Sequence, residues 1–168
     1  TQAGAATMSI FEQAEEAGLA TGVISTARIT HATPASAYAH IVGRDWEADT
    51  NLPEDAVGTC KDIAAQLVDW DFGDGFEVVF GGGRSNFMLE SQADPEDETK
   101  TGARAERDLI ADWQQKYNDG EYIWNQEGFD ALSADTKHVL GLFNGSHMQY
   151  EADRETDAGG EPSIADMT

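Results

Sequence analysis

The chain has 168 residues, with 32 acidic side chains against 10 basic ones and a formal net charge of -22. Its length is sufficient for one domain with a substantial core. The charge argues against nucleic acid and anionic membranes as partners, because both attract basic patches. No apolar run approaches the length of a transmembrane helix.

The acidic excess has two interpretations. A high-salt habitat would favour such a surface, because salt screens the repulsion between carboxylates. The alternative is an ordinary acidic secreted protein.

The first elements expected along the chain are a helix and a strand. Ser9 and Glu12 have the spacing of a capping box, and Gly18 is a natural helix stop, so we predict a helix between them. The β-branched run that follows predicts a buried strand over residues 22–27.

Two prolines then mark expected helix starts. Pro34 suits the first position of a helix, which we predict over residues 35–41. Pro53 opens a second predicted helix that continues to Val68. Cys60, the single cysteine, falls on the apolar face of this second helix, so we expect a buried, inert thiol.

The remaining elements alternate between strands and helices. The predicted ranges are strand 77–80, helix 104–117, strand 121–124, helix 126–132 and strand 138–142. Such alternation implies crossover connections and an α/β fold, a mostly parallel sheet with helices on both faces. The acidic stretch from Glu90 to Thr101 is expected to be a surface insertion loop.

The last residues have the form of a helix start. Ser163 is a candidate N-cap with Asp166 three residues later, and the sequence printed here stops at Thr168. We therefore expect residues 1–168 to be an internal segment, part of a larger domain. A frayed C-terminal tail is the alternative.

The candidate site lies where the first strand ends. His31, Thr33 and Arg44 follow that strand, and ligands of open α/β sheets bind at the carboxyl edge. A guanidinium such as that of Arg44 offers parallel N–H donors that match two phosphoryl oxygens. A surface Arg, a helix-capping Thr and a loop His are the plain alternatives.

This stretch, VISTARITHATPASAYAHIVGR, resembles the alkaline phosphatase family, in which T-x-x-x-x-[HD]-A-[TS]-P-A precedes an Arg. VFGGGR at residues 79–84 and LGLF at residues 140–143 are similar to later stretches of that family, in the same order. The three glycines lack the spacing of a phosphate-binding loop, so we expect a tight turn there. The chain thus looks like a segment of an acidic, halophilic-type bacterial member.

The resemblance implies a phosphomonoesterase that acts at alkaline pH through a phosphoserine. Arg44 would clamp the substrate phosphate and Thr33 would help to bind Mg²⁺. His31 stands where other members have an Asp that reaches the magnesium through water, so the magnesium preference should weaken. The nucleophilic Ser and the Zn²⁺ ligands lie in other segments of the family. Members are usually homodimers, exported to the periplasm or out of the cell.

The animal branch of the family has a further metal site that suggests calcium here. Its ligands match Glu96, the carbonyl of Phe143, Asn144 and Glu161. Asn144 replaces an acid, and the loop before Glu161 is longer than in those relatives. Solvated acidic loops therefore remain an open alternative. A wholly different hypothesis is a complete, non-catalytic acidic domain that binds divalent cations or a partner surface.

Overall fold

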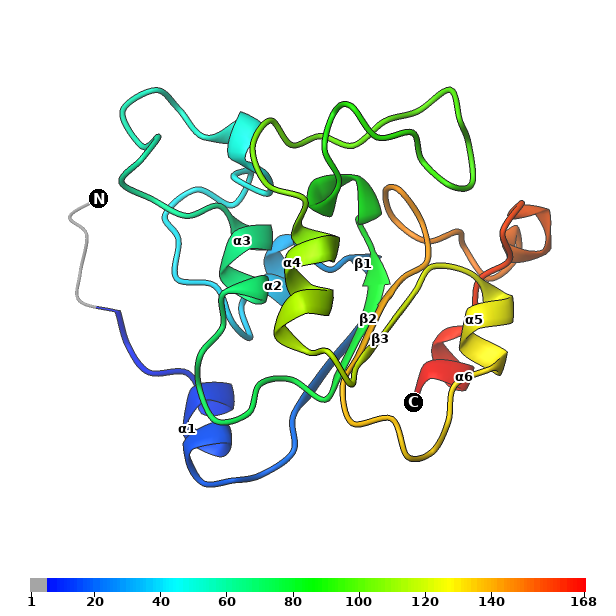
Figure 1. The fold of residues 1–168 in the computed structure, drawn as a ribbon, viewed down its shortest axis with the longest axis horizontal. Coiled ribbons are helices and arrows are strands. Elements are labelled where there is room, and N and C mark those ends of the chain that lie inside the picture. The colour runs from blue at the N-terminus through cyan, green and yellow to red at the C-terminus, as the bar shows by residue number, and fades with distance from the viewer. Residues whose placement is uncertain (1–5) are drawn as a thin grey trace.

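A computed structural model describes residues 6–168, which are organised around one parallel sheet (Figure 1). Its strands lie in the order β1-β2-β4-β3, and each neighbouring pair is parallel. Their bounds are β1 Gly22–Arg28, β2 Val78–Gly82, β3 Glu121–Ile123 and β4 Val139–Leu142. The carboxyl ends of all these strands therefore meet at one edge of the sheet, as the sequence predicts.

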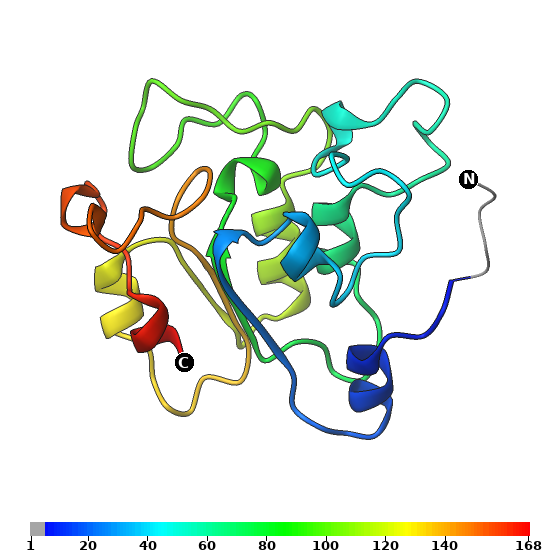
Figure 2. The same ribbon diagram turned by 180° about the vertical axis from the view of Figure 1, so that it is seen from behind.

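Helices cover both faces of this sheet, which confirms the predicted α/β class. The bounds are α1 Ile10–Glu16, α2 Ala32–Ala35, α3 Ile63–Val68, α4 Leu109–Lys116, α5 Gln126–Asp130 and α6 Ile164–Met167. Figures 1 and 2 show α3 and α4 over one face, and α5 and α6 over the other. Within residues 6–168, no helix has the length and apolarity that crossing a membrane requires.

Two apolar clusters fill the spaces between the sheet and its helices. The larger one joins α2, α3 and α4 to side chains such as Val79 and Leu140. The smaller one joins Phe80, Phe143 and Met167 on the opposite face. Val79 and Phe80 are neighbours on β2 and enter different clusters, because successive side chains of a strand point to opposite faces.

The predicted helix starts at both ends of the described chain are confirmed. Ser9 and Glu12 form a reciprocal capping box at α1, and Gly18 follows its end with φ of 70°. Ser163 and Asp166 form the same arrangement at α6.

The prediction of a helix over residues 35–41 is wrong. The helix α2 is shorter and earlier, with His31 at its N-cap and Pro34 at its third position. Pro34 is tolerated there because the first turn of a helix needs no N–H from it. Beyond the helix, the Tyr38 hydroxyl donates to the Ile29 carbonyl at 2.9 Å and is buried with it. This contact turns the chain back to the sheet, so the helix does not continue.

The long helix predicted from Pro53 to Val68 is also wrong in its first half. Residues 54–59 form turns, with Gly58 at φ of 75°. The helix α3 begins only after Asp62, whose side chain accepts from the Ala65 N–H. Cys60 lies in this irregular part and is exposed, so the expected buried thiol is not found.

The helix predicted over residues 104–117 starts later, because Arg104 has a tertiary role. Its guanidinium is buried against Asp62, with N–O distances of 2.8 and 3.0 Å. Asp108 then caps α4 by accepting from the Ala111 N–H. The acidic segment from Glu90 to Thr101 is irregular, and Asp94 within it is buried.

The three glycines after Phe80 allow a close approach of two backbones, as predicted. A side chain on Gly82 would place its Cβ 2.1 Å from the carbonyl oxygen of Ser146. Gly83 has φ of 92° and donates its N–H to the carbonyls of Asn144 and Ser146. Gly81 and Gly82 belong to β2, so the expected tight turn is confined to Gly83, which precedes a 3₁₀ turn at Arg84–Phe87.

Candidate functional site

Two of the predicted residues meet at the carboxyl end of β1. The Nη2 atom of Arg44 lies 3.2 Å from Nε2 of His31. The Arg44 side chain is 62% exposed, and its carboxylate neighbour Asp45 stands 3.8 Å away. Most of the guanidinium therefore faces solvent, where it can bind an anion.

Thr33 lies on the same short segment, within α2. It is exposed, and the helix N-cap is His31. The interpretation of Thr33 as the helix cap is therefore wrong. Because the residue is exposed, a ligand can reach its side chain.

Sequence reasoning missed a buried carboxylate behind this edge. Glu47 is 8% exposed and accepts both Nε and Nη2 of Arg28, at 2.8 and 2.7 Å. It also accepts from the Thr30 hydroxyl at 2.6 Å and the Asn86 amide at 3.1 Å. Burial raises the pKa of Glu47, but the hydrogen bonds from Arg28 and Thr30 outweigh it and hold the pKa below its usual range. Glu47 is thus a fixed anion that orients Arg28.

The sequence analysis also missed His147, which contacts both Arg28 and His31. Its ring centroid lies 5.3 Å from that of His31, edge to face. The main-chain N–H of Arg28 donates to its Nδ1 at 3.0 Å. Burial lowers the pKa of His147, and the positive charge of Arg28 lowers it further. Arg28, His147, His31 and Arg44 therefore form a row of nitrogen-bearing side chains at the sheet edge.

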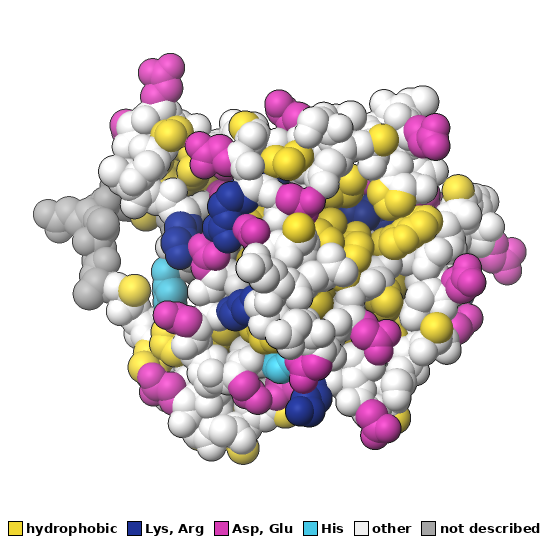
Figure 3. All heavy atoms as spheres, viewed as in Figure 1, with side chains coloured by type: hydrophobic (Ala, Val, Ile, Leu, Met, Phe, Trp, Pro, Cys, Tyr) yellow, Lys and Arg dark blue, Asp and Glu magenta, His cyan; other side chains and the backbone are white. Residues whose placement is uncertain are grey.

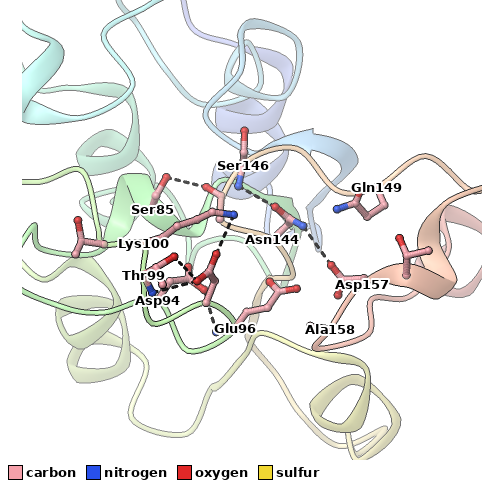
Figure 4. A pocket seen from close by; sticks show the side chains of 14 residues that line it. Ser85, Asp94, Glu96, Thr99, Lys100, Asn144, Ser146, Gln149, Asp157 and Ala158 are labelled. Atoms are coloured by element: carbon pink, nitrogen blue, oxygen red, sulfur yellow. Dashed lines mark hydrogen bonds and ion pairs between the residues drawn. The ribbon is translucent and has the colours of Figure 1, made fainter.

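A second hollow, of about 780 Å³, lies beyond the ends of β2 and β4. Glu96 and Asn144 line it, together with Asp157, which the sequence analysis did not select (Figure 4). The Asn144 amide lies 3.4 Å from Oδ2 of Asp157. Phe143, at the end of β4, is fully buried beside Asn144. Three of the four predicted calcium residues thus belong to this region, and Glu161 adjoins it.

Two carboxylate oxygens here are buried without a hydrogen-bond partner, Oδ1 of Asp157 and Oε2 of Glu161. Glu161 is 1% exposed. Burial raises its pKa to about 7, and the nearby carboxylates of Asp157 and Glu96 contribute. Burial likewise raises the pKa of Asp157 to about 6, with a contribution from Glu96. Unpaired buried carboxylates are costly, and a bound cation would relieve that cost.

Side-chain positions do not yet form a metal cage in this structure. Among residues 6–168, no three His, Cys, Asp or Glu side chains converge at metal-binding geometry. Calcium takes six to eight oxygens, including carbonyl and amide oxygens and water, in flexible geometry. The donors here are oxygens, which calcium prefers. Their side chains would have to rotate to surround a bound calcium ion.

Comparison with known proteins identifies the family. The model of the alkaline phosphatase family matches residues 1–168. The membrane-bound alkaline phosphatase of Bombyx mori is 40% identical over 171 residues, covering 95% of this chain and 30% of that protein. The tissue-nonspecific alkaline phosphatase of Gallus gallus is 39% identical over 176 residues, covering 99% and 33%.

A solved structure agrees with the sequence matches. The alkaline phosphatase of Thermus thermophilus superposes with a TM-score of 0.66 at 28% identity, covering 94% of this chain and 26% of that one. The chain belongs to the alkaline phosphatase family. It spans about a third of the length of these curated relatives.

Proposed function

We propose that this chain is a segment of a metal-dependent phosphomonoesterase, in which Arg44 binds the phosphate of the substrate. The position of Arg44 carries the proposal. Its guanidinium lies beside His31 at the carboxyl edge of a parallel sheet and is largely exposed. A guanidinium placed this way stabilises the charge on the oxygens of a transferring phosphoryl group.

The other groups of the reaction are divided between this chain and the remainder of the protein. Thr33 is an exposed residue whose hydroxyl oxygen is of a type that Mg²⁺ accepts, and His31 lies near it in the sequence. The family resemblance implies that the nucleophilic Ser and the Zn²⁺ ligands belong to other parts of the protein. Zinc and magnesium, when bound, supply electrostatic stabilisation of the phosphoryl oxygens. On this proposal, the 168 residues alone are inactive.

Localisation and assembly are proposed on the same basis. We expect the full-length protein to be a homodimer, exported to the periplasm or out of the cell, as family members usually are. The net charge of -22 supports adaptation to salt, and acidic side chains are spread over the face shown in Figure 3.

The test of this function is hydrolysis of p-nitrophenyl phosphate at alkaline pH with zinc and magnesium supplied. We expect the full-length protein to hydrolyse it and the 168-residue chain to be silent. Activity of the short chain alone would mean that the nucleophile lies within it. A silent full-length protein would favour the non-catalytic, cation-binding alternative.

A second function, calcium binding, is favoured by the two unpartnered carboxylate oxygens. Glu96, the carbonyl of Phe143, Asn144 and Glu161 are the ligands that the family resemblance implies. Asp157 would supply the negative charge that Asn144 lacks, because its buried Oδ1 has no other partner. Residues of this kind hold Ca²⁺ rather than a transition metal, since all the donors are oxygens.

We expect the full-length protein to bind Ca²⁺ in calorimetry, and Glu161→Gln or Asp157→Asn to weaken binding about tenfold or more. Without calcium, Glu161→Gln should raise the unfolding temperature, because it removes a buried, unpaired charge. With excess calcium, the unsubstituted protein should have the higher unfolding temperature, because it binds the ion more tightly. The matched control is Asp166→Asn, whose carboxylate caps the exposed start of α6. Equal calcium affinities in all four proteins would rule out this site.

A further inference from the structure

The ring of His147 faces two hydrogen-bond donors of one residue, Arg28. Its Nδ1 lies 3.0 Å from the main-chain nitrogen of Arg28. Its Nε2 lies 2.9 Å from Nη1 of the same residue. Both atoms of Arg28 carry hydrogen, and neither can accept a hydrogen bond.

A neutral imidazole cannot satisfy both contacts. It has one nitrogen that accepts and one that donates. If Nδ1 accepts from the Arg28 amide, then Nε2 carries the proton and points at the N–H of Nη1. The other tautomer moves the same conflict to the amide, and a protonated ring has it at both nitrogens. Either way, two donors meet where an acceptor is required.

Arg28 is held too firmly to turn away from this conflict. Its Nε and Nη2 are both bonded to Glu47, and Glu47 is fixed in turn by Thr30 and Asn86. Nη1 is the nitrogen of the guanidinium that remains outside this pair. An oxygen anion near Nη1 and Nε2 would accept from both, and such charge-assisted bonds are strong.

These two donors, Nη1 of Arg28 and Nε2 of His147, lie close to Arg44, the residue proposed to bind the phosphate. His31 lies between His147 and Arg44. Its ring centroid is 5.3 Å from that of His147, and its Nε2 is 3.2 Å from Nη2 of Arg44. His147 is exposed, so a ligand can reach it.

We propose that Nη1 of Arg28 and Nε2 of His147 form a second oxyanion subsite. It takes a phosphate or carboxylate on the leaving group of a substrate, while Arg44 holds the phosphate that is hydrolysed. This inference depends on the proposed function for the role of Arg44, but the anion subsite can be tested separately.

The kinetic test uses the full-length protein with three substrates. Pyrophosphate carries a second phosphate, phosphoglycolate carries a carboxylate, and p-nitrophenyl phosphate has an uncharged leaving group. His147→Ala and Arg28→Lys should lower kcat/KM for an anionic leaving group about tenfold more than for p-nitrophenyl phosphate, the size expected for one charge-assisted hydrogen bond. A larger loss with pyrophosphate than with phosphoglycolate identifies phosphate as the preferred group, and the reverse identifies carboxylate.

The matched control is Arg107→Lys. Arg107 also binds a carboxylate with two nitrogens, that of Asp69 at 3.2 and 2.9 Å, but far along the chain from the site. Arg107→Lys should change kcat/KM by the same factor for all three substrates. Equal losses for all three substrates in His147→Ala would overturn the subsite. Should Arg28→Lys fail to fold, the exposed His147 still provides the test.

A binding measurement separates this inference from the proposed function. Calorimetry should show that His147→Ala weakens the binding of methylenediphosphonate about tenfold more than the binding of methylphosphonate. The same ratio of affinities in the variant and the unsubstituted protein would refute the subsite. If p-nitrophenyl phosphate is not hydrolysed, the proposed function fails, yet the diphosphonate result still decides whether these donors bind a second anion.

Discussion

Replacement of Arg44 by Ala in the full-length protein is expected to lower kcat/KM for p-nitrophenyl phosphate by about 10²–10³-fold. Two N–H donors of a guanidinium match two oxygens of the phosphoryl group, and no other side chain supplies that geometry. Folding should be unaffected, because the side chain is 62% exposed and its contacts are the long ones to His31 and Asp45.

Two further variants give this result its meaning. Arg44→Lys should fall between the unsubstituted protein and the Ala variant, because an ammonium keeps the charge and loses the bidentate geometry. Arg107→Ala is the control for removing a partly exposed arginine, since its side chain is 42% exposed. An Arg44→Ala protein with unchanged kcat and KM would exclude Arg44 as the phosphate clamp.

The parallel sheet could be predicted because its signals are local. The apolar run after Thr21 and the alternation of strands with helices required no knowledge of distant contacts. The capping boxes at Ser9 and Ser163 are local too, since each involves a residue three positions later. These are the elements that the structure confirms.

The helix boundaries that failed are those set by tertiary contacts. Arg104 fits a helical pattern, but its buried pairing with Asp62 holds it outside α4. Tyr38, three residues beyond α2, bonds to Ile29, one residue beyond β1, and this buried contact favours the turn over a longer helix. The segment before Cys60 has helical spacing, yet Gly58 adopts a positive φ that ends such a run. Periodicity alone reports none of these contacts.

The candidate site also contains some residues that a local pattern identifies and others that only tertiary contacts bring in. His31 and Arg44 lie on one continuous segment, so their proximity follows from a strand and a turn. His147 reaches the same edge from a loop 119 residues after Arg28, and no local pattern marks it. Asp157 likewise enters the acidic hollow from the loop before Glu161, and the resemblance marks no ligand at that position. Only the arrangement of the sheet brings these residues together.

The second large effect is expected from Arg84, which is fully buried where β2 ends. Its guanidinium binds Asp94 through two nitrogens, at 3.0 and 2.7 Å, and Glu96 at 2.8 Å. It also donates to the carbonyl of Leu142 at 3.0 Å and lies over the ring of Trp124. Burial opposes its charge, but the bonds to Asp94 and Glu96 raise its pKa above the usual value. Arg84 thus joins the acidic loop to the sheet.

Arg84→Met is therefore expected to lower the free energy of unfolding by about 3–5 kcal/mol. The reason is that Asp94, which is 4% exposed, would lose its positively charged partner and keep only the main-chain N–H of Glu96. Urea denaturation of the full-length protein, followed by tryptophan fluorescence, measures the change. Arg107→Met is the control, since removal of a partly exposed ion pair should cost less than about 1 kcal/mol.

A double variant tests whether the unpaired carboxylate is the cause. Arg84→Met combined with Asp94→Leu removes both charges, and replacement of a buried ion pair by apolar side chains is often nearly neutral. The double variant should therefore recover most of the stability lost in the single one. A double variant as unstable as Arg84→Met would show instead that the loss comes from the bonds to Leu142 and Trp124, which hold the end of the sheet in place.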